Sequence, residues 1–203
     1  MAVKLTKNEQ KKQKDQLKQF QRYLPTLQLK KSQLQSVIRE VEAEMEELRR
    51  KQEDAIKGLD SWIAVYGENE IFPSEKSIDT LIKVKEIKKT YSNVAGVTVP
   101  VFDSLTFEDI RYSFDEYPLW VDGAIFSLCD IAKYDALIAT LKEEVMLLEK
   151  ELRVTTQRVN LFEKVKIPEA KENIRVIGIY LQDQQTQAVV RGKIAKRKLT
   201  KVG

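Results

Sequence analysis

Histidine is absent from the 203-residue sequence, and cysteine occurs once, as Cys129. Without histidine the chain cannot form a Ser-His-Asp triad, a Cys-His pair or an imidazole metal site. A single cysteine excludes an internal disulfide and is typical of proteins in a reducing compartment. Most acid–base enzyme mechanisms are therefore excluded, and we expect no catalytic, cofactor-binding or metal-binding residue.

Long apolar runs are also missing. A helix that crosses a bilayer needs about 18 consecutive apolar residues, and no apolar run in the sequence approaches that length. The first residues, Met1 to Lys7, lack the apolar core of a signal peptide. These absences predict a cytoplasmic protein that is at most peripheral to a membrane.

Glycine and proline do not occur in the 44 residues from Ala124 to Ile167. Apolar residues recur there at alternating steps of three and four, which is the heptad pattern of a helix packed along another helix. A second such pattern runs from Leu17 to Trp62. We expect the seam of a coiled coil, meaning its row of core positions, at Leu34, Ile38, Val41, Met45, Leu48, Ile138, Leu141, Val145, Leu148 and Leu152.

The N-terminal helix is predicted to begin at Thr6, because Thr6 and Glu9 have the spacing of a capping box. Pro25 removes one ladder hydrogen bond, but the heptad phase continues across it, which indicates a kink rather than an end. Lys31 and Gln52 occupy seam positions. They either disfavour other registers of the helix pair or contact a further subunit.

Aromatic residues and prolines are concentrated in the middle of the chain: 11 of the 16 aromatics and three of the five prolines lie within residues 62–126. Segments rich in β-branched and aromatic residues occur there at 81–91, 93–102 and 111–114, which predicts two to four short strands. We expect Gly96 to lie in a hairpin or bulge rather than in a ligand-binding loop.

These patterns together predict a mainly α-helical chain, a long antiparallel two-helix coiled coil with a small head, containing a β-hairpin, inserted between the helices. The expected domains are residues 1–65 for the N-terminal helix, 66–121 for the head and 122–203 for the C-terminal helix with its tail. Pairing Trp62 with Ala124 places Phe20 near Lys166, to within a heptad. Pro168 then lies near the level of Pro25, so both helices are expected to bend there.

The formal net charge is only +4, but basic residues are concentrated at the two ends. Residues 1–20 carry a charge of +4 and residues 191–203 carry +6, which leaves −6 for the remainder. Both basic ends meet at one tip if the helices are antiparallel. Such clusters bind phosphates without sequence preference, but the near absence of interleaved aromatics argues against nucleic-acid binding.

Adjacent acidic residues, Glu46-Glu47 and Glu143-Glu144, are the remaining candidates for acid–base chemistry. Basic residues lie close to each pair in the sequence, which is typical of solvated helix faces where ion pairs contribute about 0.2–0.5 kcal/mol. We therefore expect both acidic pairs to be exposed and to have no catalytic role.

Within residues 155–168, Arg158 and Asn160 flank the seam residue Val159 and are expected to point sideways. This segment, the run Asn93-Val94-Ala95-Gly96-Val97 with Pro100, residues 27–34 and the basic tail 191–198 together resemble the D subunits of the V-type and archaeal-type rotary ATPases. The resemblance covers most of the chain in the same order. Two features depart from the family pattern: Gln157-Arg158 replaces two adjacent arginines, and the glutamine-rich residues 181–187 replace a glutamate-rich segment.

The resemblance implies a non-catalytic central-stalk subunit, a rotor shaft that couples ATP hydrolysis or synthesis in a ring of A and B subunits to translocation of H⁺ or Na⁺. The implied partners are the A and B subunits and further stalk subunits that lead to the membrane rotor. No cofactor, nucleic acid or direct membrane insertion is implied, and self-association of the isolated chain is a further expectation. The candidate partner contacts are Arg158, Asn160, Arg175, Arg191, Lys193, Lys196, Arg197 and Lys198.

Two other classes of protein share parts of this architecture. A prefoldin-like chaperone also has a β segment between two coiled-coil arms, but it needs exposed apolar residues at the arm tips, where this chain has lysine and arginine. A basic coiled-coil nucleic-acid-binding protein would associate with DNA or RNA in a salt-sensitive manner.

Overall fold

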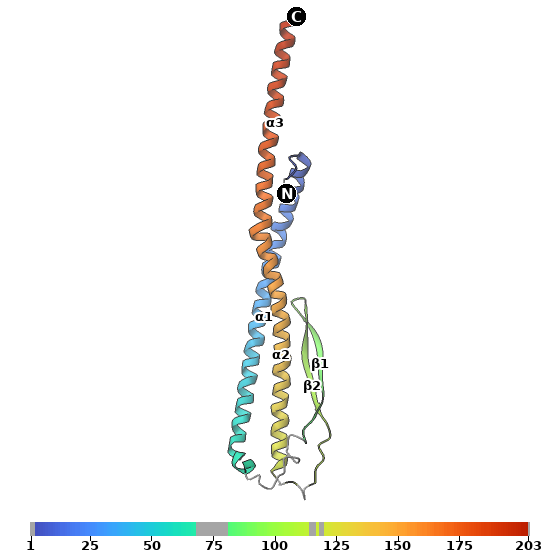
Figure 1. The fold of residues 1–203 in the computed structure, drawn as a ribbon, viewed down its shortest axis with the longest axis vertical. Coiled ribbons are helices and arrows are strands. Elements are labelled where there is room, and N and C mark those ends of the chain that lie inside the picture. Colours follow the sequence, from blue (N-terminus) through green and yellow to red (C-terminus); the bar gives the residue numbers. More distant parts are fainter. Residues whose placement is uncertain (1–2, 68–80, 114–116, 118–119, 203) are drawn as a thin grey trace. The chain divides into compact units, whose positions relative to one another are not determined.

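The computed structural model describes residues 3–67, 81–113, 117 and 120–202, and the side chains of 60–67 and 199–202 lie outside this description. Helices dominate: α1 (Lys7–Gly67), α2 (Val121–Leu161) and α3 (Ile167–Val202), with the π-helical turn η4 (Phe162–Lys166) joining α2 to α3. Strands β1 (Val84–Val94) and β2 (Val97–Phe107) lie between α1 and α2 in the sequence (Figure 1). The predicted fold class, mainly α with a hairpin between helices, is confirmed.

The chain divides into two compact units. Unit 1 contains Met1–Ser32 and Arg153–Gly203, and unit 2 contains Gln33–Leu152. The N-terminal part of α1 and the C-terminal part of α2 thus belong to unit 1 together with α3. The expected division into a head and two arms at residues 65 and 121 stays a prediction.

Helix α1 starts as the sequence predicts, but with only half of the capping box. The backbone N–H of Glu9 donates to Thr6 Oγ1 at 3.2 Å, and the helix begins at Lys7. In a full capping box the Glu9 side chain would also accept from the Thr6 N–H. Here the Thr6 N–H donates to Lys4 O at 3.0 Å, and Glu9 Oε1 accepts from Gln13 Nε2 at 2.9 Å. The helix continues through Pro25, as predicted from its unbroken heptad phase.

The core of unit 2 is formed by α1, α2 and the hairpin. Leu34 and Ile38 of α1, Leu148 of α2 and Val99 of β2 are buried in one cluster. Partly buried Val37, Val145, Leu152, Val94, Ala95 and Val97 pack against it. Each buried aliphatic side chain contributes roughly 1.5–3 kcal/mol relative to its exposed state, so apolar burial holds these three elements together.

The two helices of unit 2 run antiparallel. Leu34 shares a cluster with Leu148, whereas Gln52, further along α1, donates from Nε2 to Asp135 Oδ1 at 2.7 Å, earlier in α2. A hydrogen bond from the polar seam residue Gln52 to a side chain of the facing helix is specific to one register of the pair. It therefore favours the register interpretation of Gln52 over a contact with a further subunit.

The hairpin consists of two antiparallel strands of 11 residues each, joined by a two-residue turn. Ala95 and Gly96 have φ angles of 51° and 81°, the positive values that a type I′ turn requires. Asn93 Oδ1 accepts a hydrogen bond from Gly96 N–H at 3.0 Å. The expected hairpin at Gly96 is confirmed, and the number of strands falls within the predicted range.

The strands lie three to five residues further along the chain than the predicted segments 81–91 and 93–102. The strand pairing has two register irregularities, between Val84 and Glu86 and between Lys88 and Lys89. The strands continue to pair on both sides of each irregularity, as is usual for a β-bulge. Arg111, Tyr112 and Ser113 lie in no strand, and Phe114 lies outside the described residues. That part of the strand prediction is wrong for residues 111–113.

Unit 1 contains a second antiparallel helix contact. The rings of Phe20 and Phe162 stack with their centroids 5.3 Å apart, and Asn173 Nδ2 donates to Gln13 Oε1 at 3.5 Å. Phe20 and Lys166 line the same cavity, as the predicted register required. Among the side chains of this unit that the structure describes, those below 5% exposed are Thr155, Val159, Ala170 and Ile177.

The π-helical turn η4 ends two residues before Pro168, the second residue of α3. The N–H of Ile167 donates to Phe162 O, five residues earlier. Pro168 has no N–H, and its ring would crowd the carbonyl of Lys164 in a regular α-helix. A wider turn accommodates that crowding without ending the helix.

Candidate partner-binding surfaces

The described residues carry no arrangement that suggests catalysis. No group of three or more Cys, Asp and Glu side chains within these ranges could hold a metal ion. Cys129 is half-buried, and burial raises the pKa of its thiol. A raised thiol pKa keeps the side chain protonated and unreactive. In the same part of the chain, no helix is both long enough and apolar enough to span a membrane.

The expected seam residues are buried or half-buried within unit 2. Leu34, Ile38, Val41, Ile138 and Leu148 are buried. The remaining five are half-buried: Met45, Leu48, Leu141, Val145 and Leu152. Lys31, the other polar residue at a seam position, is also half-buried. These residues line the helix contacts of unit 2.

One acidic residue departs from the expected exposed position. Glu144 is only 8% exposed. Its exposed neighbour Glu143 forms an ion pair with Lys89 of the hairpin, with Nζ and Oε2 2.6 Å apart. Burial raises the pKa of Glu144, and the negative charge of Glu44 on α1 adds to this effect. Adjacent helix residues point about 100° apart, so one member of an acidic pair can be buried while the other is exposed. Glu46 and Glu47 are exposed, as expected.

Arg158 and Asn160 lie in the last turn of α2, on either side of Val159, which is 4% exposed. Both polar side chains are exposed, and neither makes a hydrogen bond or an ion pair with the residues that the structure describes. Leu161 and Val165 nearby are 44% and 48% exposed. The end of α2 thus combines an available guanidinium with exposed apolar side chains.

Arg175 differs from Arg158 because it already has a partner on its own helix. Its Nε and Nη2 donate to the two carboxylate oxygens of Glu172 at 2.8 and 2.7 Å. The hydrogen bond from Arg175 lowers the pKa of Glu172. A binding partner at this position would have to compete with Glu172 for the guanidinium.

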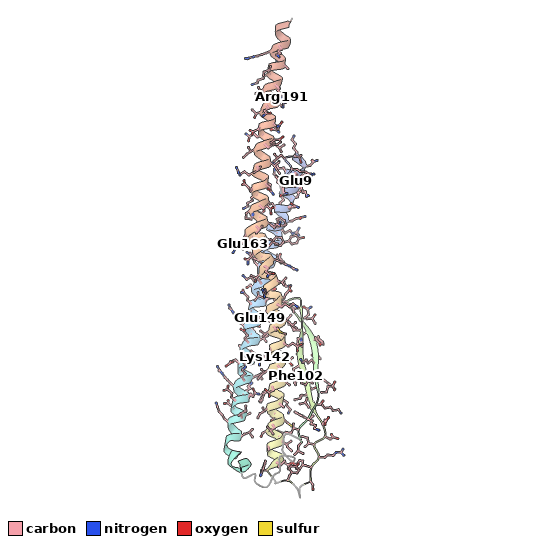
Figure 2. The ribbon with its side chains drawn as sticks, in the orientation of Figure 1. Glu9, Phe102, Lys142, Glu149, Glu163 and Arg191 are labelled. Carbon is pink, nitrogen blue, oxygen red and sulfur yellow. The ribbon has the colours of Figure 1, made fainter. Side chains whose placement is uncertain are left out.

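The basic tail is exposed on all sides of α3. Arg191, labelled in Figure 2, donates from Nε to Gln187 O at 3.3 Å, so its hydrogen bond stays within the helix. The other tail candidates, Lys193, Lys196, Arg197 and Lys198, are also exposed. At about 1.5 Å per helical residue, Arg158, Arg175 and this tail are roughly 25 Å apart in succession, so the structure does not bring the candidates into one site.

Two polar contacts were missed by the sequence analysis. The ion pair between Lys89 and Glu143 joins residues 54 positions apart, and no local pattern indicates which lysine would reach α2. The contact between Gln13 and Asn173 had a local signal, because Gln10 and Gln13 continue the three-four spacing ahead of Leu17. Extending the heptad pattern of α1 to polar residues would have placed Gln10 and Gln13 at the helix contact.

Comparison with known proteins gives the chain a family. A family model for the ATP synthase D subunit matches residues 9–197. The V-type ATP synthase D subunit from Borreliella burgdorferi is 49% identical over 199 residues, which cover 98% of this chain and 96% of the relative. The proteins of the same name from Chlamydia pneumoniae and Chlamydia abortus are 32% and 33% identical, over 98% and 97% of this chain and 94% and 93% of theirs. The chain therefore belongs to the family of ATP synthase D subunits.

Proposed function

We propose that this protein is the non-catalytic central-stalk subunit of a V/A-type rotary ATPase, a shaft that couples ATP hydrolysis or synthesis to the translocation of H⁺ or Na⁺. The family match over residues 9–197 is the observation that carries this proposal. It favours a rotary-ATPase subunit over a prefoldin-like chaperone or a basic nucleic-acid-binding coiled coil.

The packing within each unit suits a part that transmits torque. A single helix in water is marginally stable and bends easily. In unit 2 an apolar core joins α1, α2 and the hairpin, and in unit 1 the Phe20–Phe162 stack joins two helical stretches. Helices packed in this way resist bending and twisting together, because a relative displacement would disturb buried side chains on both.

The proposed partners are the catalytic A and B subunits of the ATPase ring and the stalk subunits that lead to the membrane rotor. This places the protein in the cytoplasm, peripheral to the membrane. Arg158 and Asn160 are the best-supported candidate contacts, because both are exposed and make no contact of their own with the described residues. Arg175 and the tail cations are further candidates.

Co-purification from native cells tests the assignment. A tagged chain is expected to recover the A and B subunits, and ATP-driven rotation of a probe fixed to this chain should follow when the ring is immobilised. A variant with Leu34→Asp and Leu148→Asp, which places charges in the buried core of unit 2, is the control for correct folding. Recovery of unfolded clients or nucleic acid without A and B subunits would contradict the proposal, as would an active ring in which the chain does not rotate.

A further inference from the structure

The seam of α1 becomes polar near its N-terminus. The three-four spacing of Leu27, Leu24, Phe20 and Leu17 continues in phase to Gln13 and Gln10. Gln10 and Gln13 are both half-buried, so these amides occupy positions at which residues further along α1 place aliphatic side chains. The α1 side of the helix contact in unit 1 is therefore of two kinds, apolar from Leu17 to Leu27 and amide-lined before Leu17.

The amide-lined part combines a long hydrogen bond, a close contact with a glycine and a cavity. Asn173 Nδ2 lies 3.5 Å from Gln13 Oε1, at the outer limit of a hydrogen bond. Gln10 rests on Gly178, where a Cβ would lie 3.4 Å from Gln10 Nε2. A cavity of about 190 Å³ opens between the helices and is lined mainly by polar side chains, including Gln13, Gln16, Lys166, Glu169 and Asn173.

An aromatic contact marks the change from polar to apolar packing. Phe20 and Phe162 stack with their centroids 5.3 Å apart, and Phe20 also lines the polar cavity. Aromatic pairs of this kind hold their geometry and bury large apolar surfaces. Separation of the helices ahead of Phe20 would thus stop at this stack.

The N-terminal turns of α1 lie beside a buried apolar residue of α3. Ile177, which precedes the glycine against which Gln10 rests, is 0% exposed. Its neighbours Val176, Ile179 and Tyr180 are already 38%, 48% and 40% exposed. If residues 7–16 moved away and Ile177 became exposed, it would adjoin Tyr180 and Val176, whereas Ile179 points about 160° away from it on the helix.

We propose that residues 7–16 of α1 are a releasable cover, which opens and closes over α3 while the rest of α1 stays packed. Amide contacts stabilise the closed form weakly, because water satisfies the same groups when the helices separate. Once released, residues 7–16 are an end of α1 without tertiary contacts, and helical stability in proteins comes mostly from such contacts, so their backbone hydrogen bonds open readily. Opening is then a local event that leaves the remainder of the molecule folded.

Amide hydrogen exchange of the full chain tests this cover. The protection of residues 10–17 is expected to be uniform and at least tenfold lower than that of residues 34–48, with a step near Phe20. Ordinary fraying would instead affect only the first turn and increase gradually along α1. Equal protection on both sides of Phe20, or a gradual rise along α1 without a step, would overturn the proposal.

Replacing the amides with leucine should close the cover. In the triple variant Gln10→Leu, Gln13→Leu and Asn173→Leu, we expect protection of residues 10–17 to rise at least tenfold, while that of residues 34–48 changes less than threefold. Gln19→Leu is the matched control, because Gln19 is exposed on the same helix, and it should leave both segments unchanged. A triple variant that leaves residues 10–17 unprotected, or a control that protects them equally, would contradict the role of the amides.

Discussion

At the scale of single residues, Glu144 is in an unfavourable place for a charge. It is 8% exposed, and burial followed by the charge of Glu44 raises the pKa of its carboxyl group. Since the pKa in the folded chain exceeds that in the unfolded chain, the folded state binds this proton more tightly. The resulting destabilisation is absent at pH values below the unfolded pKa of about 4.3 and develops as the pH rises through the folded value.

Glu144→Gln should therefore stabilise the protein at neutral pH. We expect the unfolding midpoint at pH 7.5 to rise by about 1–3 °C, the range that a change of up to about 1 kcal/mol produces in a chain of this size. The gain should shrink at pH 4, where the carboxyl group of Glu144 is mostly protonated in both the folded and the unfolded chain. Thermal unfolding followed by circular dichroism at the two pH values measures the difference.

Glu149→Gln is the control for this prediction, because Glu149 is exposed on the same helix and makes no hydrogen bond or ion pair with the described residues (Figure 2). It should leave the midpoint unchanged at both pH values. A midpoint that falls at pH 7.5 in Glu144→Gln would show instead that the ionised carboxylate stabilises the fold.

The position of Glu144 shows what the heptad pattern could and could not predict. The pattern correctly indicated two long helices, because residues such as Leu34 and Leu148 recur at core spacing and burying them dominates the energetics. It could not predict how much surface beside the seam would be covered, since that depends on how closely the helices approach. Glu144, three residues after Leu141 and four before Leu148, lies in that flanking region.

At the scale of the elements, the hairpin depends on its two-residue turn. Ala95 adopts a positive φ of 51°, although it is not a glycine, and Gly96 adopts 81°. Ala95 also packs against the core cluster of unit 2, so its methyl group contributes contacts that glycine would lack. This apolar contact is a physical reason for alanine at a position where the backbone favours glycine or asparagine.

Gly96→Ala should weaken the hairpin. A Cβ at a positive φ costs about 1–2 kcal/mol, and Gly96 is exposed, so no compensating contact is expected. We expect the unfolding midpoint to fall by about 2–6 °C. Thr98→Ala, at an exposed position of β2 next to the turn, controls for the mutation of a surface residue and should change it much less. Equal midpoints for Gly96→Ala and the wild type would mean that the turn conformation does not limit stability.

The strands and the π-helical turn show where prediction from sequence stops. The segment before the turn was recognised by its β-branched and aromatic residues, but the 11-residue length of each strand depends on pairing with a partner that no local pattern contains. Pro168 predicted a disturbance of the helix, because its ring crowds the carbonyl four residues earlier. Either a kink or a π-helical turn can relieve this crowding, and the structure has the π-helical turn. Proline chemistry alone does not choose between them.

At the scale of the whole molecule, the basic tail is separable from the folded units. Every described side chain from residue 182 to residue 198 is exposed, whereas Ile177 is fully buried. Removing residues after Leu181 thus removes no buried side chain among those described. We expect the truncated chain to keep its unfolding midpoint within about 2 °C, as is usual for changes confined to the surface.

The same truncation should weaken coupling in the assembled ATPase if the tail acts as an electrostatic bearing inside the ring. We expect the number of ions moved per ATP hydrolysed to fall at least threefold, measured in vesicles reconstituted with the complex.

A full-length control with Arg191, Lys193, Lys196, Arg197 and Lys198 all replaced by glutamine separates charge from length. If charge is what matters, the neutral tail should couple as poorly as the truncated one, and its defect should resemble that of the wild type in high salt, which screens charges over a few ångströms. Normal coupling by the truncated chain, with its A and B subunits still bound, would contradict a bearing role for the tail while leaving the shaft assignment intact.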